Sequence, residues 1–407
     1  MNKEFLVNKS GSVTLNVTAN RIDSYRMKEE TTGTVRVYRD GKIGVAGALG
    51  EPDEAALTAQ AEKALSLGIP YVCALDGALE KEEHHERVIV PEKELVPTMQ
   101  TLLDRISEAC PRFAVSNKIM LSRSFSEYRN SNGRHLVCSD NALTIALLFQ
   151  SRGSGNLMDC FYECTGRNFD PDAVVADCRT LYDAFYTSAD IEEGEWPVVL
   201  GVGDLFGTFF RNFIGEMYVS GASLVSGKLG ERIFSEKLTF TDDRNPMTCP
   251  NARFFDTEGQ FVPDFRVPFI ERGVLRNVLT TKNTAAQLGL PVSGTSAASY
   301  DGVPSYGLSG LYVEPTAGKL CEIVSGKAIF VVMASGGDTT PDGHFATPVQ
   351  CSFLLENGRL VGRLPELNIS GDFYSLLGEN YLGAVRGDPL PSEDATFCVT
   401  RMKVTKE

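Results

Sequence analysis

Residues 196–243 read WPVVLGVGDLFGTFFRNFIGEMYVSGASLVSGKLGERIFSEKLTFTDD, and this stretch decides the fold. The residues Val198 to Leu200 predict a short buried strand, and Asp204 stands at the N-cap position ahead of a periodic apolar run. Apolar residues recur every four positions, which predicts an amphipathic helix over about 204–218. The opposite face carries a polar stripe: Thr208, Arg211, Asn212, Gly215 and Glu216. We expect function to be decided on this stripe.

Length and charge narrow the class of protein. The chain has 407 residues, of which 43% are hydrophobic, so it can bury the cores of two or three domains. Its net charge is −14 and no run is rich in Lys or Arg, which argues against direct nucleic-acid binding. No apolar run is long enough for a signal peptide or a membrane span. With ten cysteines best explained as reduced core thiols, these features predict a cytoplasmic protein.

Upstream of residue 196 the sequence alternates between strand and helix patterns. Predicted strands, in chain order, are 13–17, 23–28, 33–38, 43–46, 115–127, 135–138 and 144–150. Apolar periodicity predicts helices over 52–68, 97–109 and 172–186. Asp40-Gly41 supplies the positive φ that a tight hairpin turn requires. We therefore expect an N-terminal α/β domain over residues 1–190, with an antiparallel sheet and helices, ending at the acidic stretch 190–195.

Downstream of residue 243 the pattern consists mostly of short strands. They are predicted at 266–271, 274–279, 311–314, 328–333, 347–355, 359–364 and 395–404, with one helix near 283–288. Strands without regular intervening helices favour antiparallel α+β architecture over a doubly wound sheet. The second predicted unit is therefore a β-rich C-terminal domain over residues 196–407, which carries the helix at about 204–218.

Glycines at the start of this helix allow a nucleotide-binding interpretation. Gly201, Gly203 and Gly207 follow a strand and lead into a helix N-terminus, as in dinucleotide-binding loops. However, the last glycine comes one residue late, and neither a second βαβ unit nor a P-loop Lys-Ser/Thr pair follows. A glycine turn that lets the strand and the helix pack closely is therefore the favoured explanation.

Several segments of the chain resemble a known family. SGKLGE over 226–231 and LTFTDD over 238–243 are similar to the TldD/PmbA family of peptidase-related proteins. VRVYRDGKIG over 35–44, FDTEG over 255–259 and IERGVL over 270–275 resemble it as well. The resemblance implies an N-terminal α/β domain, a β-rich C-terminal domain and dimers that enclose a cavity. Members of the active type cleave unfolded peptides with a zinc ion held by an HExxxH helix and a C-terminal cysteine, and older naming links the family to modulation of DNA gyrase.

The chain departs from the family at the implied metal site. Aligned on the flanking segments, the first histidine falls at Arg211, the acid at Asn212 and the second histidine at Glu216, while the cysteine falls at Cys398. A guanidinium offers zinc no lone pair, and an amide cannot accept a proton from a bound water at neutral pH. The resemblance therefore implies no intact catalytic set and no bound metal in this chain. We expect the opposite charges of Arg211 and Glu216 to stabilise the helix in place of a cation.

Other candidate ligand groups give no alternative metal site. His84 and His85 lie in a charged, solvated run, and Cys160 and Cys164 have no partner pair at metal-binding spacing. No Gly-x-Ser-x-Gly elbow supports a serine hydrolase.

The resemblance together with the missing ligands predicts a PmbA-like, metal-free member of the family. Such a protein is the non-catalytic subunit or pseudoenzyme of a peptide-processing metalloprotease complex, without zinc-protease activity of its own. Its expected partners are an HExxxH-bearing, TldD-like subunit in a heterodimer, or a second copy in a homodimer, and an extended peptide client. Zinc is expected only in the catalytic partner. A homodimeric adaptor that binds peptides without proteolysis is the alternative, and a nucleotide-binding protein is a more remote one.

Overall fold

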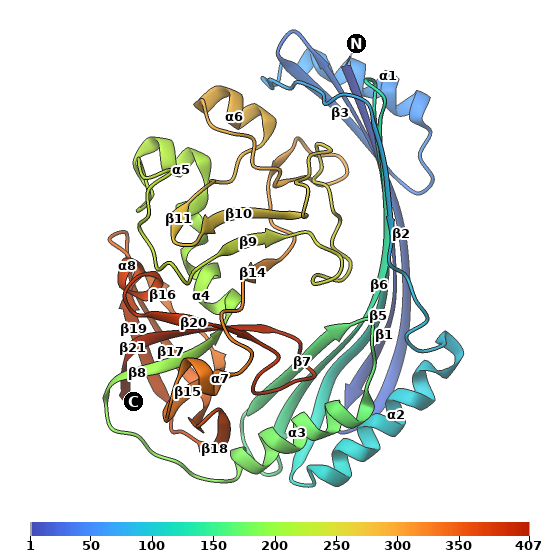
Figure 1. Cartoon of the computed structure of the whole chain (residues 1–407). Helices are drawn as coiled ribbons and strands as arrows, with labels where there is room; N and C mark the ends of the chain where they lie inside the picture. The colour runs from blue at the N-terminus through green and yellow to red at the C-terminus, as the bar shows by residue number, and fades with distance from the viewer. Residues whose placement is uncertain (1, 407) are drawn as a thin grey trace.

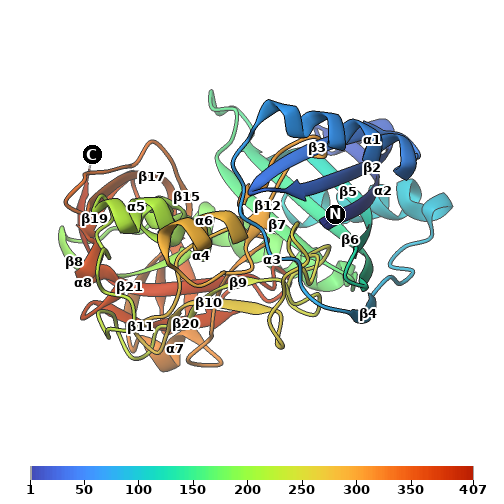
Figure 2. The ribbon, with the colours of Figure 1, turned by 90° about the horizontal axis from the view of Figure 1, so that it is seen from above.

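The computed structural model describes residues 2–406, which form two lobes side by side (Figures 1 and 2). A long curved sheet of N-terminal strands stands along one side of the molecule, and a body of shorter strands lies on its concave side (Figure 1). The chain passes from the first lobe to the second between α3 (Pro171–Phe185) and β8 (Gly194–Gly201).

One sheet organises the N-terminal lobe. Within the described residues its strand order is β3-β2-β1-β5-β6-β4, and β7 also pairs with β6. These strands are β1 (Asn2–Thr18), β2 (Arg21–Arg39), β3 (Lys42–Leu49), β4 (Leu79–His84), β5 (Phe113–Asn130), β6 (Arg134–Ser151) and β7 (Cys160–Gly166). The pairing of β4 with β6 is parallel, and the other strand pairs of this sheet are antiparallel. Strands of 17 to 19 residues, each roughly 60 Å long, run from one end of the lobe to the other.

The long strands correct the predicted boundaries. The runs 23–28 and 33–38, predicted as separate strands, both belong to β2, and 135–138 and 144–150 both belong to β6. Exposed polar residues interrupt the hydrophobic pattern in the middle of β2, yet its backbone pairing with β1 continues through them. The predicted turn at Asp40-Gly41 is confirmed, with φ angles of 51° and 68° between β2 and β3.

Helices cover the two ends of this sheet (Figure 1). At one end lies α1 (Glu54–Ala64), which continues into the 3-10 turn η1 (Leu65–Leu67). Asp53 caps α1, because its Oδ1 accepts the amides of Ala55 and Ala56 at 3.0 Å. At the other end lie α3 and α2 (Glu92–Ala109). The predicted start of α2 at residue 97 is wrong: Pro97 lies inside the helix, whose apolar face already begins with the fully buried Leu95.

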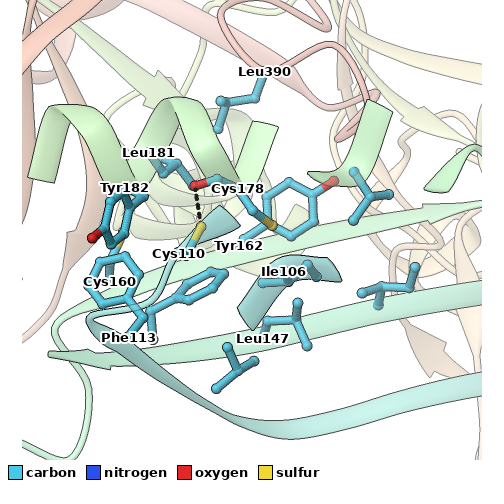
Figure 3. Packing of buried hydrophobic residues seen from close by; sticks show 14 of the residues in the cluster. Ile106, Cys110, Phe113, Leu147, Cys160, Tyr162, Cys178, Leu181, Tyr182 and Leu390 are labelled. Atoms are coloured by element: carbon cyan, nitrogen blue, oxygen red, sulfur yellow. Dashed lines mark hydrogen bonds between the residues drawn. The ribbon is translucent and has the colours of Figure 1, made fainter. Parts of the chain in front are cut away.

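The largest apolar cluster connects the two lobes. Phe113 of β5 packs against Phe149 of β6 and against Tyr182 and Phe185 of α3, with ring centroids 5.0 to 5.4 Å apart. Figure 3 shows α2 and α3 meeting over the strands, where the Cys110 thiol donates to the Cys178 carbonyl at 3.5 Å. The same cluster includes buried side chains from strands of the C-terminal lobe, such as β8 and β21. This cluster therefore packs the two lobes against each other, while a second large cluster fills the C-terminal lobe.

The C-terminal lobe is built around strands that close on themselves. Pairing runs in the order β15-β8-β21-β19-β17-β16, and β15 also pairs with β17, while β18 and β20 flank this ring. Besides β8, its strands are β15 (Lys327–Ala334), β16 (Asp338–Thr339), β17 (His344–Glu356), β18 (Arg359–Arg363), β19 (Leu367–Asp372), β20 (Tyr381–Arg386) and β21 (Thr396–Lys406). Two short helices belong to this part of the chain, α7 (Leu320–Ile323) and α8 (Phe373–Leu377).

A second, smaller sheet lies beside this ring, above it in the view of Figure 1, with strand order β11-β10-β9-β14. The elements between residues 240 and 313 are β9 (Phe240–Asp243), β10 (Arg266–Glu271), β11 (Val274–Leu275), α6 (Lys282–Leu288), β12 (Ser296–Ala297), β13 (Ser305–Tyr306) and β14 (Leu311–Val313). The predicted α+β class is confirmed, since antiparallel sheets dominate and helices are peripheral. No helix in residues 2–406 combines the length and the hydropathy that crossing a bilayer requires.

Candidate functional site

The segment predicted as one helix over about 204–218 folds as three short pieces. They are α4 (Val202–Phe209), the 3-10 turn η2 (Phe210–Phe213) and α5 (Gly215–Ser220). Between the last two, Ile214 is extended, with φ −79° and ψ 128°. The prediction of a continuous helix is therefore wrong. The predicted cap is wrong as well, because Gly201 occupies the N-cap position and Asp204 lies in the first turn of α4.

A long-range backbone pairing breaks the helix. The carbonyl of Phe213 accepts the amide of Leu279 at 2.6 Å, and the amide of Gly215 donates to the carbonyl of Leu279 at 3.0 Å. A Cβ at residue 215 would lie only 2.9 Å from that carbonyl oxygen, so glycine permits the close approach. These bonds replace hydrogen bonds of a continuous helix, so the backbone changes direction at Ile214. The apolar residues on either side of the break still follow the helical spacing.

Arg211 and Glu216 consequently lie on different pieces of the segment. Arg211 belongs to η2 and Glu216 to the first turn of α5, and both residues are exposed. Within the part of the chain that the structure describes, neither side chain has a hydrogen-bond or ion-pair partner. The expected stabilising pair of opposite charges is therefore wrong.

Asn212 has a structural role. It is buried, and its Nδ2 donates to the carbonyl of Phe209 at 3.2 Å. Its Oδ1 accepts the amide of Leu224 at 2.9 Å, and its own carbonyl accepts the Ser223 hydroxyl at 2.6 Å. The side-chain amide thus holds the loop after α5 against η2, and both of its polar atoms are already engaged.

Cys398 lies in the core of the C-terminal lobe. It belongs to β21, where it pairs with Leu200 of β8 and Ala384 of β20, and it is fully buried. Burial raises the pKa of its thiol to about 12, although a side-chain hydrogen bond with Tyr381 lowers it. Burial therefore favours the protonated thiol in the metal-free chain.

The donor set at the implied metal positions does not fit zinc. It consists of a cationic guanidinium, an amide with both polar atoms engaged, one exposed carboxylate on a separate helix and a buried neutral thiol. Elsewhere in residues 2–406, no group of three or more His, Cys, Asp or Glu side chains is arranged to hold a metal ion.

A groove runs along the exposed face of α4. It has a volume of about 350 Å³ and lies between α4 and the segment that joins β15 to β17. Its lining comprises Leu200, Gly203, Asp204, Gly207, Thr208, Ala334, Ser335, Gly336, Gly337, Phe345 and Thr347. Four of these eleven residues are glycines, so much of the groove wall is bare backbone.

The glycines of the nucleotide-binding interpretation belong to this region. Gly201 is the last residue of β8 and the N-cap of α4, so no loop separates the strand from the helix. Gly203 and Gly207 lie within α4 and face the groove. Nucleotide binding remains a prediction that the fold does not test.

A buried network of charged residues joins the lobes, and sequence reasoning missed it. Glu4 of β1 is 1% exposed, and its carboxylate accepts the hydroxyls of Tyr38 and Tyr128, each at 2.8 Å. Arg36 of β2, also 1% exposed, donates through Nη1 to the carbonyl of Thr257 at 2.6 Å. Its Nη1 lies 3.6 Å from the Glu4 carboxylate. A cation from the N-terminal sheet is thus fixed on the backbone of the C-terminal lobe.

The C-terminal half of this network centres on Glu258. Its carboxylate accepts the Tyr71 hydroxyl at 2.8 Å and the Lys282 amide at 3.0 Å. The Lys282 Nζ reaches across to Asp76 at 2.7 Å. Burial, followed by the nearby carboxylates of Asp256 and Glu4, raises the pKa of Glu258 to about 7. Residue 258 belongs to the FDTEG segment of the family resemblance, but no local pattern connects it with residues 71 or 282.

Comparison with known proteins places the chain in a family. The sequence profile of the PmbA/TldA metallopeptidase C-terminal domain matches residues 193–394, which begin just before β8 and include α4, the groove and Glu258. The chain belongs to the TldD/PmbA family.

Curated TldD/PmbA relatives align over part of their length. A metalloprotease of Archaeoglobus fulgidus is 27% identical over 198 residues, covering 47% of this chain and 45% of that protein. The zinc metalloprotease TldD homolog of Saccharolobus solfataricus is 24% identical over 265 residues, covering 62% of this chain and 59% of that protein. The chain therefore spans about half the length of these curated relatives.

A solved structure extends the likeness to the whole chain. TldE from Thermococcus kodakarensis superposes with a TM-score of 0.80 at 20% identity, covering 100% of this chain and 96% of that one. Both lobes therefore have the fold of a TldD/PmbA family structure.

Proposed function

We propose that this chain is a metal-free TldD/PmbA protein that holds extended peptide without cleaving it, as the non-catalytic subunit beside a zinc-bearing relative. The observation that carries the proposal is the donor set at Arg211, Asn212 and Glu216. A permanently charged guanidinium opposes a divalent cation, and the Asn212 amide already binds Phe209 and Leu224. Glu216 is the one remaining carboxylate, and it stands alone on α5.

Hydrolysis of a peptide bond needs an activated water and a group that accepts its proton. In zinc peptidases the metal lowers the pKa of the bound water, and a nearby carboxylate accepts the proton. Asn212, at the position of that carboxylate in the family alignment, has an amide that does not titrate at neutral pH. Both requirements would thus have to be met by a different subunit.

The groove beside α4 supports binding of an extended chain. Glycine-rich walls let a peptide backbone come close, and the Thr208, Ser335 and Thr347 side chains add hydroxyl groups. Recognition through main-chain hydrogen bonds suits unfolded clients, because it depends little on their sequence. In this proposal residues 1–190 and 196–407 act as two domains of a cytoplasmic protein, and its free thiols fit a reducing compartment.

Metal content and peptidase activity test the proposal directly. Purified protein is analysed for zinc and incubated with a fluorogenic unfolded peptide, with and without added zinc and with a chelator. The Saccharolobus solfataricus zinc metalloprotease TldD homolog serves as the matched positive control. We expect substoichiometric zinc and no cleavage by this chain, whereas the control cleaves. Stoichiometric zinc together with chelator-sensitive cleavage would overturn the proposal.

Co-purification from native extract tests the partner. Recovery of a family member that carries HExxxH, with cleavage by the mixture but not by this chain alone, supports the subunit role. If this chain is instead recovered as a homodimer that binds peptide without cleaving it, the subunit role is refuted and the homodimeric adaptor is supported.

A further inference from the structure

The groove beside α4 contains one charged lining residue, Asp204. It is exposed in the first turn of the helix, and no basic side chain in residues 2–406 forms an ion pair with it. Desolvation in the groove raises the pKa of its carboxyl, although the carboxylate accepts the backbone amide of Gly201 and that hydrogen bond lowers the pKa.

Two glycines on the same helix face have no structural explanation. Gly203 and Gly207 are four residues apart in α4, and neither has a positive φ angle. A Cβ added at either position would meet no atom within 4 Å. Each glycine inside a helix costs about 1 kcal/mol relative to alanine. These two groove-lining glycines thus lower helix stability, although neither the backbone conformation nor the packing requires glycine at either position.

The glycines on the opposite wall of the groove, unlike those of α4, have a structural explanation. There Gly336 has a φ angle of 83°, and a Cβ at Gly337 would lie 2.5 Å from that of Thr347, so both glycines are required by the fold. Of the two walls, only the α4 wall lacks side chains at positions where the fold does not require glycine. Leu200 and Phe345 add apolar surface to the lining.

These features match the chemistry of a long basic side chain. Lysine and arginine carry an apolar stem that packs on apolar surface and a cationic end that needs a carboxylate. Apolar side chains and an unpaired acid are both present in the groove, and the bare α4 face leaves room for the stem. The same acid opposes phosphate groups, which disfavours nucleotide as the occupant.

We infer that the groove is a subsite for a lysine or arginine side chain of the bound peptide, with Asp204 binding its cationic end. This inference rests on the proposed peptide-binding function and adds a preference among peptides. Gly203 and Gly207 keep the subsite open.

Fluorescence polarisation with matched peptides tests the subsite. The probes are labelled, unstructured ten-residue Gly/Ser peptides with either lysine or the uncharged norleucine at the centre. A charged hydrogen bond contributes about 1.5–3 kcal/mol, so we expect the lysine peptide to bind roughly tenfold or more tightly. Asp204→Asn keeps an oxygen for the Gly201 amide and removes the charge, so it should abolish the preference. Asp342→Asn is the control, because Asp342 is an exposed acid outside the groove lining.

Filling the groove provides an independent readout. Gly207→Leu introduces a better helix former, so the thermal midpoint should stay equal or rise while affinity for the lysine peptide falls roughly tenfold. Equal binding of the two peptides, or an unchanged preference in Asp204→Asn, would overturn the subsite and leave peptide binding intact. Absence of binding by both peptides would instead overturn the proposed peptide-binding function.

Discussion

The buried carboxyl of Glu258 makes stability depend on pH in a predictable direction. Its pKa is about 7 in the folded protein, against an ordinary value of 4.5. Because the folded-state pKa is the higher one, its contribution to stability is full below about pH 4.5 and is lost as the pH rises through 7. At about 1.4 kcal/mol for each pKa unit, the whole loss is about 3 kcal/mol.

Glu258→Gln isolates this contribution. Glutamine has the same shape, and it can accept the Lys282 amide through Oε1 while donating to the Tyr71 hydroxyl through Nε2. Urea unfolding of both proteins between pH 4.5 and 8 gives the free energy of unfolding at each pH. We expect the free energy of unfolding of the wild type, minus that of the variant, to fall steadily by about 2–3 kcal/mol as the pH rises from 4.5 to 8. A flat difference, or one that grows with pH, would refute the assignment of a raised pKa to this buried carboxyl.

Three further substitutions test the structure. Asn212→Ala should lower the free energy of unfolding by about 1–3 kcal/mol in urea titration, because the partly buried Leu224 amide loses its acceptor. Asn212→Asp should lose less, because a carboxylate oxygen can still accept that amide. Arg167→Met should cost about 3–5 kcal/mol by the same assay, since the buried Asp140 loses its cation, and adding Asp140→Leu should recover much of this loss. Asp53→Ala should lower the stability of the protein by about 1 kcal/mol in thermal melts, whereas Asp53→Asn should preserve the α1 cap. An unchanged melt for Asp53→Ala, or an Arg167→Met protein as stable as wild type, would contradict the corresponding contact.

Local signals predicted much of the fold. The Asp40-Gly41 turn and the helices predicted over 52–68 and 172–186 depend on residues close together in sequence, and the structure confirms all three. Strand lengths were underestimated, because burial varies along β2 and β6 while backbone pairing does not. Sequence patterns report which side chains are buried, and a strand continues wherever its neighbour supplies hydrogen bonds.

The candidate site was only partly accessible from sequence. The replaced positions Arg211, Asn212 and Glu216 came from alignment with the family, and their chemistry argues against a metal without any coordinates. Their arrangement did not follow, because a periodic apolar pattern cannot distinguish one helix from two helices with a break at Ile214. The groove was also invisible, since Gly203 and Gly207 on α4 meet Gly336 and Gly337, more than a hundred residues away, only after folding.

The sequence by itself determined the α+β class and the Asp40-Gly41 hairpin turn, and it gave the residues Arg211, Asn212 and Glu216 on which the proposed absence of a metal rests. Each of these depends on side-chain chemistry or on neighbours a few positions away. Only the tertiary structure decided where the α4 segment breaks and which charges are buried together. Leu279 replaces the helical bonds at residues 213–215, and Glu258 meets Tyr71 across 187 residues of chain. Such contacts form between residues far apart in sequence when the folded elements pack together and exclude water. The periodicity within one segment of sequence does not predict which distant segment it will contact.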